Sequence, residues 1–597
     1  MTSPLFTHAR SPKRFFAGIV LAAQVFLGSA LPGQELKKAL PQVPPKLVPS
    51  QPGGLAGTNA PPAITHAGAQ PGEKVILAKL TGVKFVSTAA QVVSNGVATV
   101  GVDMALVPLL QTPEFAQLMK LFLDQPASMA SLERITLTAR TYLKLMAYPF
   151  MSIYLPLQDI TGGSVQVVVS AAALDDILRI EGSKYFSEAQ YRAAITQRPG
   201  EPINAHTLKE DIDWLNRNSF RNVTVVAEPG AKLGTTALKL RTTERLPLRA
   251  YTGYNNTGSQ VSDEDRLIAG LNWGNAFGLG HQLGYQFSTS PDFKTTLAHS
   301  ANYAFDLPWR HTVRVTGAYS ELEGRVVAPL TLQGRSWQVG LRYDIPLPKL
   351  TPSNTHTHTL TLGADFKASN NNLEFATIPI TDNLTHIAQL NLGYEASLTD
   401  KWGRTDFGAT LNVSPGGIGH RNREPFFTIS RAGAESHYAY ANFTLARTTR
   451  LPGALTWSPR AQFQTASGNL LGSEQMAGGG SGSVRGYEEG EAFGDNGVLL
   501  SHELALPAFS LASWFDFKQL GDSLQFFGFQ DFALLWSTDR LAGERRYTDL
   551  HSLGLGCRYQ VRNNLSVNFT HGWQLRDSHV SRSGEGARSH LAVQASF

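Results

Sequence analysis

The most constraining feature of this 597-residue chain is a two-residue alternation of apolar and polar side chains in its C-terminal part, residues 246–597. In 283–288 and again in 359–366, apolar residues occupy every second position, with small or polar residues between them. Successive side chains of a β-strand point to opposite faces of a sheet, so this period predicts strands. Two further alternating runs, 553–559 and 565–569, predict a hairpin near the C-terminus. We expect this part to be all β, without a helical segment.

Such alternation fits two architectures, a soluble sandwich with one wet face and a barrel that crosses a membrane. Three properties favour the barrel: the polar face is small and neutral, the apolar face carries aromatic residues, and the pattern continues to the end of the chain. With 16 strands, each strand and its connection would take about 22 residues, enough for the about 9–11 that span a bilayer. The last alternating residues, Leu591, Val593, Ala595 and Phe597, resemble the aromatic end of outer-membrane barrels. We predict 16 antiparallel transmembrane strands over 246–597.

The N-terminus has the composition of a secretory signal, which we predict for residues 1–30. Basic residues, an apolar stretch and small residues follow one another there: Arg10, Lys13 and Arg14, then 15–27, then Gly28-Ser29-Ala30. An N-terminal membrane anchor is the alternative, but this apolar stretch is shorter than the about 20 residues that span a bilayer. Residues 31–74 are rich in Pro and Gly, which predicts a linker.

Between the linker and the barrel, helix and strand patterns alternate twice, and we predict two small α+β domains, 75–173 and 174–245. In the first, apolar residues at helical spacing between Leu132 and Met146 predict a helix. In the second, Ser187 and Gln190 predict a capping box that opens a helix through residue 195. The remaining predicted elements are strands over 151–157 and 164–169, a helix over 208–215, and strands over 222–227 and 236–241. Each domain is thus predicted as helix followed by β-hairpin.

Composition and motifs exclude several kinds of site. A net charge of +5 is small for 597 residues and no basic arm is present, so we expect no nucleic-acid binding. Cys557 is the only cysteine, which excludes an intrachain disulfide and a Cys₂ zinc site. His356 and His358 share a strand face but lack a third ligand. No phosphate-binding Gly-x-x-x-x-Gly-Lys motif and no convincing pair of catalytic carboxylates occur, so we predict no enzyme activity, no catalytic residues, no metal and no cofactor.

Two short motifs lie in the predicted barrel: Val484-Arg485-Gly486-Tyr487 and Phe529-Gln530-Asp531. Together they resemble the motifs of the Omp85 superfamily, in which an inward-folded loop carries Val-Arg-Gly-Tyr and a barrel strand carries Phe-x-Asp. The resemblance implies that Arg485 lies in the lumen and pairs with Asp531. Physical chemistry agrees, because a partly desolvated guanidinium requires a carboxylate, Gly486 permits a sharp turn, and Tyr487 offers a packing face and a hydroxyl. Phe527 and Phe529 depart from the alternation, because they share the face of Asp531.

Within that superfamily, the layout resembles the two-partner secretion transporters, also called haemolysin secretion/activation proteins. The two α+β domains match their two POTRA domains, 248–251 resembles the entry to their barrel, and 277–283 resembles its first periplasmic turn. Members begin with a plug helix, for which only 35–40 could be helical in this sequence. The resemblance implies an outer-membrane barrel, surrounded by outer-membrane lipid and inserted by the barrel-assembly machinery, with POTRA domains in the periplasm.

The partner implied by this resemblance is a large secreted β-helical exoprotein, such as a haemolysin or an adhesin. It would be held unfolded in the periplasm, pass through the lumen and fold outside. Exposed edges of the POTRA sheets can bind an extended client as an added strand, and we place this binding near Val223 and Val225. Two alternatives stay open: an assembly factor for outer-membrane proteins, which usually has more POTRA domains, and a passive porin, which would not explain these domains or the loop motif.

Overall fold

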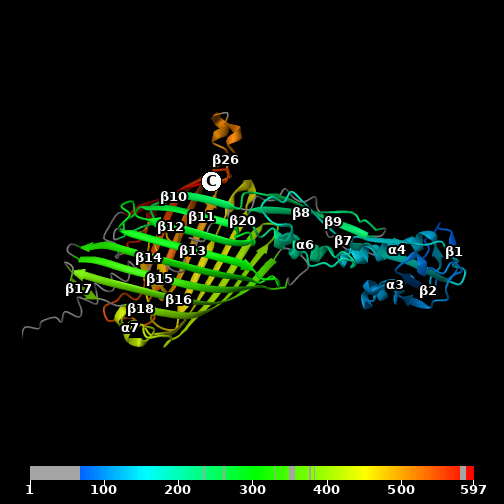
Figure 1. The fold of residues 1–597 in the computed structure, drawn as a ribbon, viewed down its shortest axis with the longest axis horizontal. Coiled ribbons are helices and arrows are strands. Elements are labelled where there is room, and N and C mark those ends of the chain that lie inside the picture. The colour runs from blue at the N-terminus through cyan, green and yellow to red at the C-terminus, as the bar shows by residue number, and fades with distance from the viewer. Residues whose placement is uncertain are drawn as a thin grey trace, which may run out of the picture. The chain divides into compact units, whose positions relative to one another are not determined.

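The computed structural model describes residues 67–597 except for 233–234, 260–261, 328–329, 349–355, 376–377, 382–383, 516 and 579–585. The predicted signal peptide and the predicted linker up to residue 66 lie outside the described residues. The described chain forms two compact units, 67–246 and 247–597 (Figure 1). None of the described helices is both long and apolar enough to cross a membrane.

The first unit consists of two α+β modules, each with helices packed on a sheet. The elements of the first module are β1 (Val75–Leu77), β2 (Gly82–Val86), β3 (Gly101–Asp103), α3 (Pro113–Lys120), β4 (Ala127–Ser128), α4 (Met129–Leu145), β5 (Met151–Tyr154) and β6 (Ser164–Ala171). Its main sheet has the order β3-β2-β6-β5, with β2 parallel to β6 and β5 antiparallel to β6. Phe85 from the sheet, Phe115 from α3 and Ile135 from α4 are fully buried in one core.

The second module repeats this plan with fewer strands. Its elements are β7 (Ala173–Glu181), α5 (Glu188–Ala194), α6 (Ala205–Leu215), β8 (Arg221–Pro229) and β9 (Thr235–Glu244). The sheet order is β7-β9-β8, so β7 and β8 are edges. Ser187 and Gln190 form the capping box of α5, as predicted. Tyr191, Leu215 and Val223 fill the core between helices and sheet.

Both predicted hairpins and the predicted helices are present, but each module also has a parallel strand that the sequence analysis missed. These strands are β2, which pairs with β6, and β7, which pairs with β9. Strand β2 is only five residues long, too short for a clear alternation. Strand β7 follows β6 after the single residue Ala172, so no turn signal separates the two modules.

A carboxylate at the end of β9 ties the second module together. Glu244 accepts hydrogen bonds from the backbone N–H groups of Lys184 and Tyr185, at 2.8 and 2.5 Å, and from the hydroxyl of Tyr191. Burial, together with this neighbouring carboxylate, raises the pKa of Tyr191 well above its ordinary value. The helix α5 is thereby fixed to the β8–β9 hairpin.

Residues 247–597 form a closed antiparallel barrel. The first strand, β10 (Leu248–Asn255), closes on the last, β29 (Ala587–Ser596). Between them lie β11 (Arg266–Ala276), β12 (His281–Thr289), β13 (Thr296–Asp306), β14 (Thr312–Val327), β15 (Leu330–Pro346), β16 (His356–Phe375), β17 (Ile378–Thr381), β18 (Leu384–Thr399), β19 (Gly403–Pro415), β20 (His437–Arg450), β21 (Thr456–Trp457), β22 (Arg460–Ala466), β25 (Asn496–Ala505), β26 (Asp522–Trp536), β27 (Thr548–Val561) and β28 (Leu565–Gln574). Strand β17 extends the β16–β18 hairpin, and β21 with β22 forms one broken strand, so the described residues contain 16 barrel strands, which confirms the predicted fold.

The barrel has an apolar outer face and a polar inner face. Leucines at alternate positions are exposed on the outside, for example Leu390 and Leu392 of β18 and Leu555 of β27. The residues between them, such as Asn391 and Ser552, are buried on the inside. The two-residue period of the sequence therefore arises because alternate side chains face lipid and lumen.

The two ends of the barrel carry different connections. Turns such as 277–280 and 562–564 are short at the end where β10 begins. The opposite end carries long loops, including residues 416–436, which we call the α7 loop because it contains the helix α7 (Glu424–Ser430). The expectation of a helix-free barrel part was therefore wrong. A helix of two turns leaves the alternation of the strands on either side unchanged, so the period could not reveal it.

Candidate functional site

The connection between β22 and β25, residues 467–495, folds back against the inner wall of the barrel, and we call it the lumen loop. Its two sides pair as a short hairpin of β23 (Met476–Gly478) and β24 (Ala492–Gly494). Near its tip, Val484 and Tyr487 are fully buried in a cluster that includes Ala533 of β26 and Leu550 of β27. The Val-Arg-Gly-Tyr motif thus lies inside the barrel.

Arg485 and Asp531 form a bidentate ion pair at this tip. The Nε and Nη2 atoms of Arg485 donate to the two carboxylate oxygens of Asp531 at 2.7 and 2.8 Å, and the Arg485 backbone N–H donates to the same carboxylate at 3.0 Å. The Ser501 hydroxyl donates to it at 2.6 Å. Arg485 is 8% exposed and Asp531 is completely buried. Removal of one partner from such a pair leaves an uncompensated buried charge, at a cost of about 3–5 kcal/mol.

A second pair of charges extends this network. Glu503 of β25 accepts from Arg485 at 3.2 Å and from Arg558 of β27 at 2.6 and 2.7 Å. Each guanidinium lies over a phenyl ring, Arg485 over Phe529 at 3.6 Å and Arg558 over Phe527 at 4.0 Å. Two arginines and two carboxylates make the network neutral, and the ring faces add cation–π attraction. This contact explains why the two phenylalanines break the alternation and face inward.

The tip of the lumen loop touches the backbone of β28. Gly486 has a φ of +96°, and a Cβ atom there would lie 2.8 Å from the carbonyl oxygen of Gly572. A Cβ atom at Gly572 would lie 2.8 Å from the carbonyl oxygen of Arg485, so both positions require glycine. Tyr487 holds the far side of the tip, because its hydroxyl accepts a hydrogen bond from the N–H of His551 at 3.1 Å.

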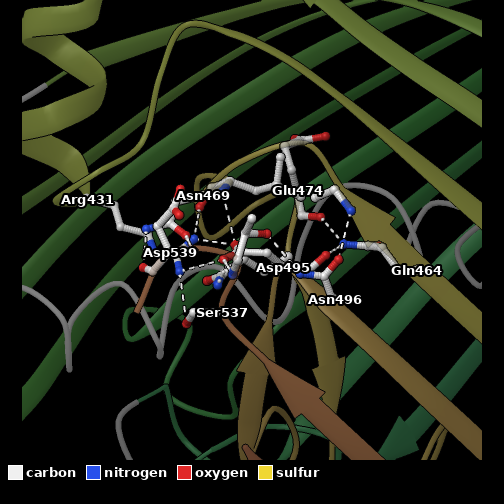
Figure 2. A network of polar contacts seen from close by, with 12 residues as sticks. Arg431, Gln464, Asn469, Glu474, Asp495, Asn496, Ser537 and Asp539 are labelled. Atoms are coloured by element: carbon white, nitrogen blue, oxygen red, sulfur yellow. Dashed lines mark hydrogen bonds and ion pairs between the residues drawn. The ribbon is translucent and has the colours of Figure 1, made fainter. Parts of the chain in front are cut away.

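Near the end of the barrel that carries the long loops, the buried carboxylate of Asp495 joins three loops (Figure 2). It accepts hydrogen bonds from the guanidinium of Arg431 in the α7 loop. It also accepts from the N–H of Leu470 in the lumen loop at 2.9 Å, and from the N–H of Thr538, after β26, at 3.0 Å. Because one carboxylate collects donors from all three segments, none of them can shift without breaking contacts to the others.

Side-chain amides complete this outer network. Asn469 donates to the carbonyl of Asp539 and accepts from its N–H, both at 2.8 Å. Gln464 of β22 donates to the carbonyls of Glu474 and Asp495, both at 3.0 Å. Figure 2 shows these side chains grouped around Asp495. The stem of the lumen loop, where it joins the barrel wall, is therefore held by polar contacts. These buried donors and acceptors have hydrogen-bond partners, as buried polar groups require.

Lys367 fastens the lumen loop to the opposite wall. Its ammonium donates to both carboxylate oxygens of Glu474 at 2.7 and 3.0 Å, and the hydroxyl of Tyr440 donates to the same carboxylate at 2.6 Å. Lys367 lies on β16, the seventh barrel strand, whereas Gly572 lies on β28, the fifteenth. Strands eight apart in a 16-stranded barrel face each other across the lumen, so the lumen loop spans its cross-section.

The residues named from the barrel motifs lie together. Val484, Arg485, Gly486, Tyr487, Phe529 and Asp531 all belong to the tip of the lumen loop and the wall beneath it. The two residues named for client binding, Val223 and Val225, lie on β8 in the other unit. There the side chain of Val223 is buried and that of Val225 packs on the same core. Their side chains therefore belong to the domain interior, and only their backbone lies at the sheet edge.

Sequence reasoning missed the outer network and the contact to the opposite wall. Arg431 and Asp495 are 64 residues apart, and Lys367 and Glu474 are 107 residues apart. The sequence signal for these pairs was weak, since each of the four residues is a single charge in a strand or loop with few other charges. Among the described residues, no group of three His, Cys, Asp or Glu side chains is placed to hold a metal ion.

Comparison with known proteins assigns the fold and this loop to a family. A family model described as haemolysin secretion/activation protein ShlB/FhaC/HecB matches residues 234–559, more than half of the chain. The chain belongs to this family. As a member of the haemolysin secretion/activation family, it lies in the outer membrane.

Relatives of this family member are named as transporters. The outer membrane transporter CdiB of Dickeya dadantii is 24% identical over 364 residues, which are 60% of this chain and 63% of that protein. The heme/hemopexin transporter protein HuxB of Haemophilus influenzae is 22% identical over 408 residues, 67% of this chain and 70% of HuxB. The hemolysin transporter protein HpmB of Proteus mirabilis is 23% identical over 331 residues, 52% of this chain and 55% of HpmB. The chain thus spans less than two thirds of the length of CdiB and HpmB.

Two solved structures share the fold of this family member. CdiB from Escherichia coli superposes with a TM-score of 0.71 at 17% identity, covering 99% of this chain and 100% of CdiB. CdiB from Acinetobacter baumannii gives a TM-score of 0.65 at 18% identity, with the same coverage. These matches show that the fold of α+β modules followed by a barrel is shared along the whole chain.

Removal of either partner of the Arg485–Asp531 pair should release the tip of the lumen loop. In a chain with Cys557→Ser and Val484→Cys, the new thiol is buried while the tip is seated, so a maleimide labels it slowly. Arg485→Ala or Asp531→Ala should raise the labelling rate at least about ten-fold, because the remaining charge is buried and unpaired. The double variant should label no faster than either single variant, since the two residues act as a unit.

The control for this experiment is Arg404→Ala, which removes an exposed arginine of β19 that pairs with Asp406 on the same strand. Labelling of Val484→Cys should stay slow in that chain. Slow labelling in the Arg485→Ala chain as well would show that the ion pair does not hold the tip.

Asp495→Ala should loosen three loops at once, because its carboxylate accepts from each of them and a hydrogen bond to a charged group contributes about 1.5–3 kcal/mol. Hydrogen–deuterium exchange followed by mass spectrometry should become faster in the α7 loop, in 467–476 and in 537–547 together. Asp539→Ala is the matched control, because Asp539 meets Asn469 through its backbone. Faster exchange in one loop alone would contradict the joining role of Asp495.

Proposed function

We propose that this chain exports a secreted exoprotein across the outer membrane by two-partner secretion. In this proposal, residues 75–173 and 174–245 are POTRA domains that bind the client unfolded in the periplasm, and residues 246–597 pass it through the barrel. The observation that carries the proposal is the lumen loop, which spans the lumen but is attached to the walls beyond its stem largely through side chains. Such a loop can be displaced while the barrel wall stays intact. Export of this kind requires no catalytic residue and no cofactor.

The chemistry of the Arg485–Asp531 pair suits a latch that opens. Inside the seated network, attraction between the charges is offset by the cost of removing both from water, so the net stabilisation of such a pair is small. When the loop leaves, both charges return to the water of the lumen together. The free-energy cost of opening the loop is therefore much smaller than the cost of a mutation that removes one partner, because the mutation leaves the other charge buried. A client that displaces the loop needs to supply only this smaller free energy.

Names of the relatives support this function over the alternatives. CdiB, HuxB and HpmB are named as transporters, one of them a hemolysin transporter. That favours export over assembly of outer-membrane proteins and over a passive porin. We propose that the client of this chain is likewise a large exoprotein.

The proposed export is tested by deleting the chain from a strain that expresses an exoprotein with its own secretion domain. The client should then accumulate in the periplasm, and expression of the chain should restore it to the medium. Wild-type amounts of client in the medium without the chain would contradict the proposed function.

We propose that the client binds along the exposed edge of β8. One side chain of the chain itself already forms hydrogen bonds with part of this edge. The amide of Asn216 donates to the carbonyl of Val223 at 2.9 Å and accepts from its N–H at 2.7 Å. In an antiparallel pair, alternate residues point their backbone groups away from the partner strand. The backbone of Val225 and Ala227 therefore points outward in the same way as that of Val223. We propose that the client pairs with 225–227 by strand addition.

Ala227→Pro should reduce export of the client several-fold, because proline removes an outward N–H at the exposed edge and leaves the ladder to β9 intact. The measurement is the ratio of client in the medium to client in the periplasm. Ala227→Thr is the matched control, since it adds a side chain but keeps the N–H, and it should export normally. Equal export by both variants would show that the client does not use this edge.

A further inference from the structure

The connection between β25 and β26, residues 506–521, is much longer than turns such as 277–280 at the same end of the barrel. Figure 1 shows this orange segment projecting away from the barrel wall. It contains two short 3₁₀ helices, η4 (Ala512–Phe515) and η5 (Lys518–Leu520). Three of its aromatic side chains are largely exposed: Trp514, Phe515 and Phe517 are 71%, 67% and 68% exposed. Several exposed aromatic side chains in one short segment indicate a binding partner.

Hydrogen bonds at the base of this segment hold it in place. Phe509 and Leu524 exchange two backbone hydrogen bonds, at 2.9 and 2.7 Å. The carboxylate of Asp522 accepts from the hydroxyl of Ser510 at 2.5 Å and from the N–H of Ala512 at 3.0 Å. The polar groups at the base are thus paired within the chain, and the aromatic side chains beyond them are presented outward.

The aromatic surface of the segment continues from the lipid-facing wall of the barrel. Phe526 faces outward from β26, the ring of Phe509 lies 6.2 Å from it, and the ring of Trp514 stacks on Phe509 at 5.4 Å. Leu504 and Leu506, at the end of β25, are exposed on the same outer face. One apolar surface therefore runs from the barrel wall through Phe509 to Trp514.

Aromatic residues also mark other turns at this end of the barrel. Phe277, Trp309 and Trp402 are each more than half exposed there. Rings of this kind concentrate where acyl chains meet headgroups. Strand β10 begins at this end and follows the two α+β modules in the chain. The placement of these modules in the periplasm rests on the proposed function, and with the modules there, the turns lie at the periplasmic leaflet of the membrane.

We infer that residues 506–521 are a lipid anchor, in which Trp514, Phe515 and Phe517 insert into the phospholipid of the periplasmic leaflet beside the barrel. Phospholipid is the occupant because the segment extends the lipid-facing wall at the level of the aromatic turns. Its first ten residues, 506–515, contain no charged residue, as insertion among acyl chains requires. By contrast, Asp516 and Lys518, on either side of Phe517 in the sequence, suit the headgroup level at which aromatic rings gather. The anchor fixes the depth and orientation of the barrel on the side of the wall where Asp531 faces the lumen.

The inference is tested with the full-length chain in bilayers of phosphatidylethanolamine and phosphatidylglycerol. A nitroxide is attached to Phe517→Cys, and in a second chain to Phe515→Cys, both with Cys557→Ser. Power-saturation spectroscopy then compares collisions with oxygen, which enters lipid, and with a water-soluble nickel chelate. Both labels should favour oxygen several-fold over the chelate, as a label at Leu504→Cys on the outer wall does. A label at the exposed Arg545→Cys, beyond β26, should favour the chelate.

Chelate accessibility at 515 and 517 equal to that at 545 would overturn the lipid anchor. Dipolar broadening that disappears when labelled chain is diluted with unlabelled chain would identify a second copy as the occupant and would also overturn it. Folding of each variant is checked by the heat-dependent shift of the barrel in SDS gels. A chain that fails this check is replaced by Trp514→Phe, for which quenching of tryptophan fluorescence by brominated lipid should fall relative to the unaltered chain. Unchanged quenching would count against the anchor.

Discussion

A guanidinium inside a barrel is stable only beside a carboxylate, and this requirement determines where the lumen loop lies. The register of β26 fixes the completely buried carboxylate of Asp531 on the inner wall. Arg485 must reach that point, and it does so only because Gly486 and Gly572 let two backbones touch. Glu503 and Arg558 then make the group neutral. A neutral network can be buried and later rehydrated as a unit, which a single charge cannot.

The wall and the loop are held by different forces, and the proposed export depends on that difference. Wall strands are joined by backbone ladders, which pair the backbone N–H and C=O groups that lipid cannot satisfy. The lumen loop is joined to opposite sides of that wall by side chains, through Lys367 on one side and Asp531 on the other. Asp495 couples its stem to the α7 loop. The loop can therefore move as one piece while the barrel stays closed.

Local rules of sequence were enough for the barrel and for the tip of the loop, but not for contacts between distant residues. The two-residue period predicted the strands because lipid and lumen impose opposite side chains on alternate positions. It could not locate α7, whose helix lies in a loop, or β2 and β7, which are short or follow another strand directly. The pairing of Arg485 with Asp531 was predicted from two motifs that resemble those of a known superfamily. The pairs made by Asp495 and Lys367 lack such motifs, and only the fold brings their partners together.

The most direct measurement of whether the lumen loop must leave its seat is export by a chain whose loop is locked with a disulfide. A Cβ atom at Gly478, in the stem, would lie 3.3 Å from the Cβ of Ala533 on β26, close to the separation in disulfides. In a chain with Gly478→Cys, Ala533→Cys and Cys557→Ser, oxidation should stop export of the client, and reduction should restore it. Export at the same rate by the oxidised and the reduced chain would show that the client passes without displacing the loop.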